Sequence, residues 1–349
     1  MLNNFLEIIT LLRYPLTSLF IILWIFSFYW KPIFKIFKLK TYNNVQRVHD
    51  SEISRLGGLV LYLFLWSLSL LGFFDDLFLR NILFASIPFA LVSFIEDLFQ
   101  NTQPKVRLIS MLMSCLIFFY LNPIQFPIID IPFLGKLINI YPISIIFFSF
   151  SVIVVMNGMN LVDGMHGLFG FTAFFQLLSI TYISLIYNHF ELVNLTLILL
   201  IILIIFLLFN FPFGKIFAGD LGAYFFGFIN SLLIIYLFGK NSQLLTWSAI
   251  LILFYPCFEL LFSFVRKLRN NLSPFDADDK HLHTLINKKL FKKIKKKVFI
   301  NSLTSLSLFF FWLIPFIFIV FFFNNFVLLI FSILLLIFLY SFFYRCMNN

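Results

Sequence analysis

Four carboxylates in otherwise apolar surroundings are the strongest candidates for chemistry. Glu96 and Asp97 are adjacent in EDLFQNTQPKVR, Asp163 lies in NGMNLVDGMHG, and Asp220 lies in FGKIFAGDLGAY. Carboxylates that are brought together repel one another unless a cation lies between them, and their hard oxygens suit Mg²⁺. Because Mg²⁺ usually takes only one or two carboxylates and completes its shell with substrate phosphates, such a group indicates a diphosphate ligand.

Basic residues and glycines accompany these acids. The candidate partners for phosphate oxygens are Arg55, Lys105, Arg107 and Lys215. Glycines beside Asp163 and Asp220 would let the backbone approach a ligand closely. The four acids and four cations together therefore predict a phosphate-binding site.

A histidine pair in SPFDADDKHLHT is a further candidate. His281 and His283 are two residues apart and could bind phosphate or a metal, although HLHT can equally be a surface turn. Each acid alone is also explained as an ordinary residue at a helix end. The basic run 288–297 is explained most simply by contact with anionic lipid.

The composition shows what must position these residues. Hydrophobic residues make up 62% of the 349 residues, charged residues 11%, and the mean hydropathy is +1.02. Soluble domains have about 25% charged residues. The chain is therefore predicted to be an all-α polytopic membrane protein, in one domain over 1–349.

Each membrane-spanning helix needs about 20 apolar residues. On this rule we predict about eleven spans, which lie near 14–30, 56–74, 80–95, 108–122, 141–157, 167–187, 192–211, 222–239, 246–265, 298–320 and 324–344.

The distribution of Lys and Arg predicts the orientation. With the N-terminus outside and the C-terminus in the cytoplasm, the basic residues left outside are Arg13, Arg80, Lys136 and Lys240. All of the motifs then lie on the cytoplasmic face, and 266–297, which carries the HxH pair, is the largest cytoplasmic loop. The acidic pair Asp75 and Asp76 falls outside and is not expected to be catalytic. Glu259 lies within a predicted span, where an ionised carboxylate is costly unless it has a partner or a function.

Five ordered motifs carry a resemblance to a known family. RVH...ISRLGG, FIEDLFQNTQPKVR, NGMNLVDGMHGL, KIFAGDLGAYFFGF and PFDADDKHLHT resemble the polyprenyl-phosphate N-acetylhexosamine-1-phosphate transferases, the glycosyltransferase family 4 of WecA and MraY. The resemblance covers roughly residues 45–285. The last motif resembles the WecA-like, O-antigen-initiating branch, since the PLHHHFE-type run of the MraY branch is absent.

The resemblance implies an Mg²⁺-dependent transfer, with Mn²⁺ as a possible substitute. A polyprenyl phosphate would attack the β-phosphorus of a UDP-N-acetylhexosamine and release UMP. Asp220 would ligate Mg²⁺ together with Asp97 and Asp163, and Glu96 with Asp97 would hold the metal or orient and deprotonate the lipid phosphate. The residues expected to bind substrate are Asn160, Asp163, His166, Lys105, Arg107, Lys215, His281, His283 and Arg55.

The resemblance also implies a multi-pass protein of the bacterial inner membrane with its active site facing the cytoplasm. We expect a UDP-sugar and a polyprenyl phosphate as partners, no nucleic acid, and leave a homodimer open. Glu96 replaces a common Asp, and His166 replaces an acid of the frequent DGxDG pattern. A transporter or lipid flippase, or an inactive paralogue with a scaffolding role, remains the alternative.

Overall fold

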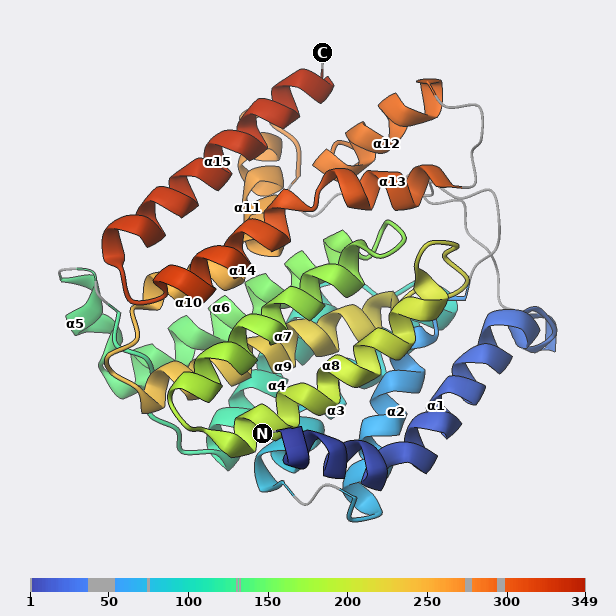
Figure 1. Cartoon of the computed structure of the whole chain (residues 1–349). Coiled ribbons are helices and arrows are strands. Elements are labelled where there is room, and N and C mark those ends of the chain that lie inside the picture. The colour runs from blue at the N-terminus through green and yellow to red at the C-terminus, as the bar shows by residue number, and fades with distance from the viewer. Residues whose placement is uncertain are drawn as a thin grey trace.

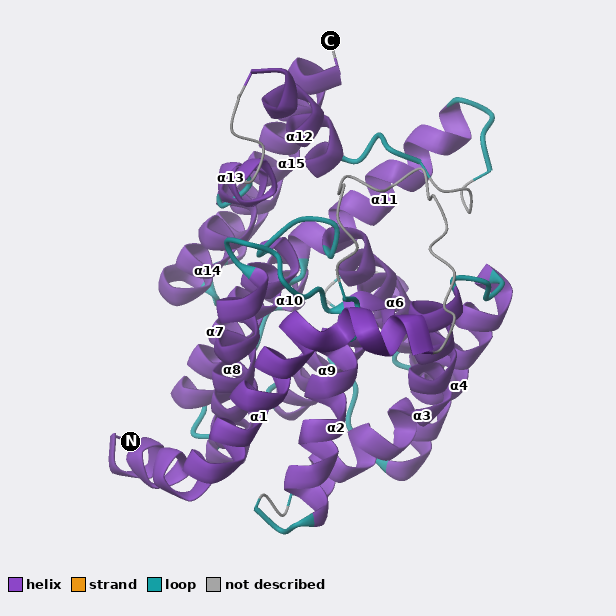
Figure 2. Ribbon diagram, turned by 90° about the vertical axis from the view of Figure 1, so that its right-hand side faces the viewer, coloured by secondary structure: helices purple, strands orange, loops and turns teal. Residues whose placement is uncertain are grey.

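The computed structural model describes residues 2–36, 54–73, 76–129, 131, 133–273, 278–293 and 299–348. Helices make up most of the described chain, and loops and turns connect them (Figures 1 and 2). Their order is α1 Leu2–Ile36, α2 Gly57–Leu70, α3 Leu77–Phe99, α4 Pro104–Leu121, α5 Leu134–Ile138, α6 Tyr141–Val162, α7 Leu168–Ile186, α8 Phe190–Asn210, α9 Gly219–Lys240, α10 Thr246–Ile252, α11 Phe254–Arg269, α12 Leu282–Lys293, α13 Ile300–Ser307, α14 Phe310–Phe322 and α15 Phe326–Asn348.

The all-α membrane architecture predicted from the sequence is confirmed, while the number of spans differs in detail. Within the described residues, nine helices are long and apolar enough to cross a membrane, and a tenth crossing is possible if α10 and α11 form one broken span. The predicted span 56–74 corresponds to α2, whose 14 residues are apolar but short for a bilayer. A helix therefore lies at each predicted span, and the orientation stays a prediction.

The predicted span 246–265 is bent by 78° between α10 and α11. Pro256 explains the position of the bend, because its nitrogen has no hydrogen to donate to the carbonyl of Ile252, the last residue of α10. The bend changes the direction of α11, which carries Glu259 and ends in the basic residues Arg266, Lys267 and Arg269.

Helix α9 lies at the centre of the bundle, and 94% of its apolar membrane-spanning stretch is buried. It packs against α2, α3, α6 and α7. The contact with α2 is close: a Cβ atom placed on Gly58 would lie 2.2 Å from the Cα atom of Gly222. Small residues at this crossing let the two backbones meet, as in other membrane helix pairs.

The loops between α6 and α7 (163–167) and between α8 and α9 (211–218) lie at the same end of the bundle, and we call this the acidic end. Figure 1 shows α5 and α10 at the opposite end. The segment before α2 joins the acidic end, since Ser54 pairs with Ile216 in a short parallel bridge. The N–H groups of Gly57 and Gly58 donate to the carbonyls of residues 217 and 218, at 3.0 and 2.9 Å, which satisfies the first N–H groups of α2.

Candidate active site at the acidic end

Two carboxylates from other helices hold the amino end of α9. Asp97 of α3 accepts hydrogen bonds from the N–H groups of Asp220 (2.8 Å) and Leu221 (3.0 Å). Asp163, the residue after α6, accepts from the N–H of Gly219 at 2.8 Å. Helix amino ends expose unpaired N–H groups and the positive end of the helix dipole, and both features favour anions. The three predicted metal ligands, Asp97, Asp163 and Asp220, are therefore brought together by α3, α6 and α9.

Gly219 makes this arrangement possible. Its φ is +70°, a region that L side chains rarely adopt. A Cβ atom there would also lie 2.2 Å from the carbonyl oxygen of Arg55 and 2.7 Å from Oδ1 of Asp97. Any side chain would push the residue-55 backbone or the Asp97 carboxylate out of place.

Arg107 neutralises the outer side of the acid cluster. Its Nη1 lies 3.2 Å from Oδ2 of Asp220 and 3.8 Å from Oε1 of Glu96, and its side chain is 25% exposed. Arg55, Lys105 and Lys215 are exposed. The site thus combines one buried carboxylate, Asp97, and three half-buried ones with accessible cations.

Glu96 and Asp97 point to different parts of the site, as expected for neighbours on a helix. Oε2 of Glu96 accepts hydrogen bonds from the N–H and the hydroxyl of Thr102, at 2.8 and 2.6 Å. Asp97 is 5% exposed and faces α9. Glu96 therefore orders the α3–α4 loop and the Arg107 side chain, whereas Asp97 lies with the other two Asp carboxylates.

Asp163 has a raised pKa and one carboxylate oxygen without a hydrogen-bond partner in the described part of the chain. Burial raises its pKa to about 8, although hydrogen bonds from the start of α9 and the charge of Arg55 act in the opposite direction. Its Oδ1 is buried and has no hydrogen-bond partner in the described part of the chain. Burying a carboxylate oxygen without a partner is costly, so this oxygen would be stabilised by a cation or a hydrogen-bond donor.

The donor chemistry of the cluster fits Mg²⁺. Among the described residues, no three or more His, Cys, Asp or Glu side chains lie close enough together to hold a metal ion by themselves. Hard oxygen donors are nevertheless present, including the unpartnered Oδ1 of Asp163. Mg²⁺ commonly takes one or two carboxylates and leaves its other positions to water and phosphate, so Asp97, Asp163 and Asp220 are a suitable set.

The HxH pair approaches the same loop from α12. A Cβ atom placed on Gly164 would lie 3.4 Å from Nε2 of His283, so this ring lies close to the residue next to Asp163. The His283 side chain is 4% exposed, and burial lowers its pKa to about 4. His281 lies behind it, with the two rings stacked at 5.6 Å. The interpretation of HLHT as a surface turn is therefore wrong, because the rings of His281 and His283 are both buried.

His166 and Asn160 have different surroundings. The His166 ring is buried against Phe217, and its Nδ1 is 3.1 Å from the carbonyl oxygen of Pro212. Asn160 is half-buried on the last turn of α6, and its carbonyl accepts from the N–H of Asp163 at 3.2 Å. Asn160 therefore lies beside the cluster, whereas the described contacts of His166 join the two loops of the acidic end.

Asn210 was not predicted from the sequence, although it links the two loops directly. Its Oδ1 accepts from the N–H of Gly167 at 2.6 Å, and its Nδ2 donates to the carbonyl of Ile216 at 2.7 Å. The signal available in the sequence was an amide at the end of a strongly apolar run, where an unpaired polar group is costly.

Part of the predicted motif region lies outside the described residues, namely 47–53 of the first motif and 274–277 of the last. Asp75 also lies outside them. Asp76 is the N-cap of α3 and accepts from the N–H of Phe78 at 2.8 Å.

Residues 58–238 match the protein family described as glycosyl transferase family 4. The chain belongs to this family. The matched segment includes Glu96, Asp97, Arg107, Asp163 and Asp220, while the HxH pair follows it. Family 4 membership therefore rests on the part of the chain that builds the carboxylate cluster.

Two curated relatives are similar over parts of their length. The undecaprenyl-phosphate alpha-N-acetylglucosaminyl 1-phosphate transferase of Thermotoga maritima is 32% identical over 84 residues, which cover 24% of this chain and 27% of the relative. The probable undecaprenyl-phosphate N-acetylglucosaminyl 1-phosphate transferase of Bacillus subtilis is 25% identical over 247 residues, 68% of this chain and 66% of the relative. The matches thus span about a quarter and just under two thirds of those proteins.

Proposed function

We propose that this family 4 protein transfers an N-acetylhexosamine 1-phosphate, or a related amino-sugar phosphate, from a UDP-sugar to undecaprenyl phosphate. The reaction would release UMP and initiate a cell-envelope glycan at the cytoplasmic face of a bacterial inner membrane. The observation that carries the proposal is the convergence of Asp97, Asp163 and Asp220 at the amino end of α9, beside Arg107. The names of the two relatives support the same lipid and the same type of sugar phosphate.

In the proposed step, an oxygen of the lipid phosphate forms a bond to the β-phosphorus, and the bond from that phosphorus to the bridging oxygen breaks. UMP leaves with that oxygen. The second pKa of a phosphate monoester is about 6, so the attacking phosphate is already largely ionised near neutral pH. A general base is therefore helpful rather than essential, and positioning together with charge neutralisation carries most of the catalysis.

The chain's own residues supply that positioning. Arg107 and the exposed Arg55, Lys105 and Lys215 would bind phosphate oxygens, with Arg107 also holding Asp220 at 3.2 Å. Asp97, Asp163 and Asp220 would hold Mg²⁺, which when bound neutralises charge that develops on the phosphoryl oxygens.

The test is UMP release by the purified protein in detergent with undecaprenyl phosphate, Mg²⁺ and a panel of UDP-N-acetylhexosamines. Release that requires both the lipid and the metal, and that is lost in Asp220→Asn, would support the proposal and name the sugar. The matched control is Glu191→Gln, which removes an exposed carboxylate in the first turn of α8, at the other end of the bundle.

No release with any donor, from protein that is folded and binds neither Mg²⁺ nor UDP, would refute the enzyme proposal. Transport or scaffolding would then be the better interpretation.

A further inference from the structure

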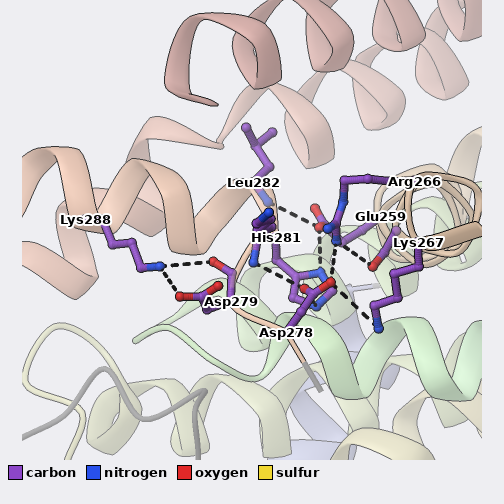
Figure 3. A network of polar contacts seen from close by, with 10 residues as sticks. Glu259, Arg266, Lys267, Asp278, Asp279, His281, Leu282 and Lys288 are labelled. Atoms are coloured by element: carbon purple, nitrogen blue, oxygen red, sulfur yellow. Dashed lines mark hydrogen bonds and ion pairs between the residues drawn. The ribbon is translucent and has the colours of Figure 1, made fainter. Parts of the chain in front are cut away.

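Glu259 is the one acidic residue of α11, and only 1% of its side chain is exposed. Its Oε1 lies 3.0 Å from Nδ1 of His281 and accepts from the N–H of Leu282 at 3.3 Å (Figure 3). Leu282 is the first residue of α12. One carboxylate oxygen therefore fixes both a ring of the HxH pair and the beginning of the helix that carries the other ring.

The chemistry of the carboxylate fixes the orientation of the His281 ring. An ionised carboxylate only accepts hydrogen bonds, so the proton of this contact must lie on Nδ1 of His281. Nε2 is then directed away from Glu259, and it lies 3.5 Å from Oδ1 of Asp278. Asp278 is itself held by Arg266 at 2.8 Å and Lys267 at 3.8 Å, as Figure 3 shows.

His283 connects His281 to the acid cluster. The two imidazole planes are only 4° from parallel, and Nε2 of His283 lies 3.4 Å from the point that a Cβ atom on Gly164, the neighbour of Asp163, would occupy. Nδ1 of His283 is buried and has no hydrogen-bond partner among the described residues. The second ring is therefore a polar group with spare hydrogen-bonding capacity next to the residue whose Oδ1 also lacks a partner.

We propose that Glu259 is a positioning residue for nucleoside-diphosphate binding, acting through His281 to hold His283 beside Asp163. The proposal rests on the proposed function, which supplies the diphosphate ligand. Glu259 itself would not touch substrate, since its side chain is 1% exposed and bonds to the start of α12. Its removal should weaken donor binding more than it slows the chemical step.

The experiment is a double-mutant cycle of Glu259→Gln and His281→Ala, with kcat and the KM for the UDP-sugar measured in detergent. Glutamine keeps the volume and one acceptor oxygen but removes the charge, and its amide allows the other tautomer of His281. Loss of a hydrogen bond to a charged group predicts a rise in KM of about 10-fold or more, with a smaller change in kcat. Glu191→Gln is the matched control and should leave both constants unchanged.

The cycle separates positioning from general stability. If Glu259 acts through His281, Glu259→Gln should add almost nothing to KM in the His281→Ala background. If Glu259→Gln does not fold, judged by its melting temperature, Glu259→Asp replaces it: the carboxylate is one methylene shorter, and the same dependence on His281 is expected.

An equal effect of the Glu259 substitution in both backgrounds, or no effect on KM, would overturn the positioning role while leaving the transferase in place. Absence of UMP release from the wild-type protein would overturn the proposed function, and the positioning role with it.

Discussion

Replacing Asp163 by Asn separates function from stability at the centre of the site. Asn keeps the shape and an oxygen that can accept from the N–H of Gly219, so the bundle should remain folded. It removes the charge that the unpartnered Oδ1 offers to a cation. We expect UMP release to fall by about 100-fold or more, the scale of losing one preorganised electrostatic group.

The effect of Asp163 on the free energy of unfolding depends on pH, and its size follows from the pKa of this residue. The pKa of Asp163 is about 8 in the folded protein, against an ordinary value of 3.8. Between these values the folded state holds a proton that the unfolded state has released, so the free energy of unfolding falls as pH rises. Between pH 3.8 and about pH 8 this single group lowers the free energy of unfolding by about 1.4 kcal/mol per pH unit, and it contributes no slope below or above that range.

The Asn variant lacks this slope, and all other groups cancel when the two proteins are compared. Between pH 6 and pH 7 the variant should therefore gain about 1.4 kcal/mol relative to the wild type, or roughly 2 to 4 °C in melting temperature. Melting in detergent without Mg²⁺ or nucleotide measures it, with Asp76→Asn at the opposite end as the control. A stability difference that does not change with pH would refute the raised pKa of Asp163, and full turnover would remove Asp163 from the site.

Three further outcomes are expected. Arg107→Gln should lower kcat/KM by about 10- to 100-fold, since it removes a cation from Asp220 and from phosphate, while Arg80→Gln at the opposite end leaves the rate unchanged; equal rates would exclude Arg107 from the site. Chelation by EDTA should abolish UMP release and added Mg²⁺ should restore it, so persistent release would argue against a metal. Gly58→Ala should cost about 1 to 3 kcal/mol of stability, because the new Cβ lies 2.2 Å from Gly222; an unchanged melting temperature would contradict the α2–α9 packing.

The acid cluster could be predicted from the sequence because residue type alone identifies it. Carboxylates are rare in a chain with 11% charged residues, so those that occur at span ends stand out. Hydrophobic runs likewise predicted the helices. The sequence does not tell which neighbouring element each side chain of a helix faces, because that depends on how the helices pack. For this reason it could not show that Glu96 binds the α3–α4 loop while Asp97 faces α9.

Asn210 and the bend at Pro256 are two further features that the sequence did not predict. The average hydropathy of 246–265 predicts one span, because it depends only on how apolar the residues are. It does not register the single missing hydrogen-bond donor at Pro256. Asn210 is one amide, and its role exists only because residues 167 and 216 come within its reach. Such contacts depend on tertiary geometry and leave no periodic signal in the sequence.

The bend also bears on the choice between catalysis and transport. From the sequence, Glu259 was the main charged residue within a span, and therefore the main point in favour of a polar path across the membrane. In the fold, α11 is bent by 78° from α10, and Glu259 is hydrogen-bonded to His281, which stacks on His283 close to Gly164 of the α6–α7 loop. Glu259 is therefore connected to the acidic end and does not extend a polar path across the membrane. A cluster of acids, cations and histidines gathered at one end of an apolar bundle favours chemistry on a headgroup phosphate held at that membrane surface.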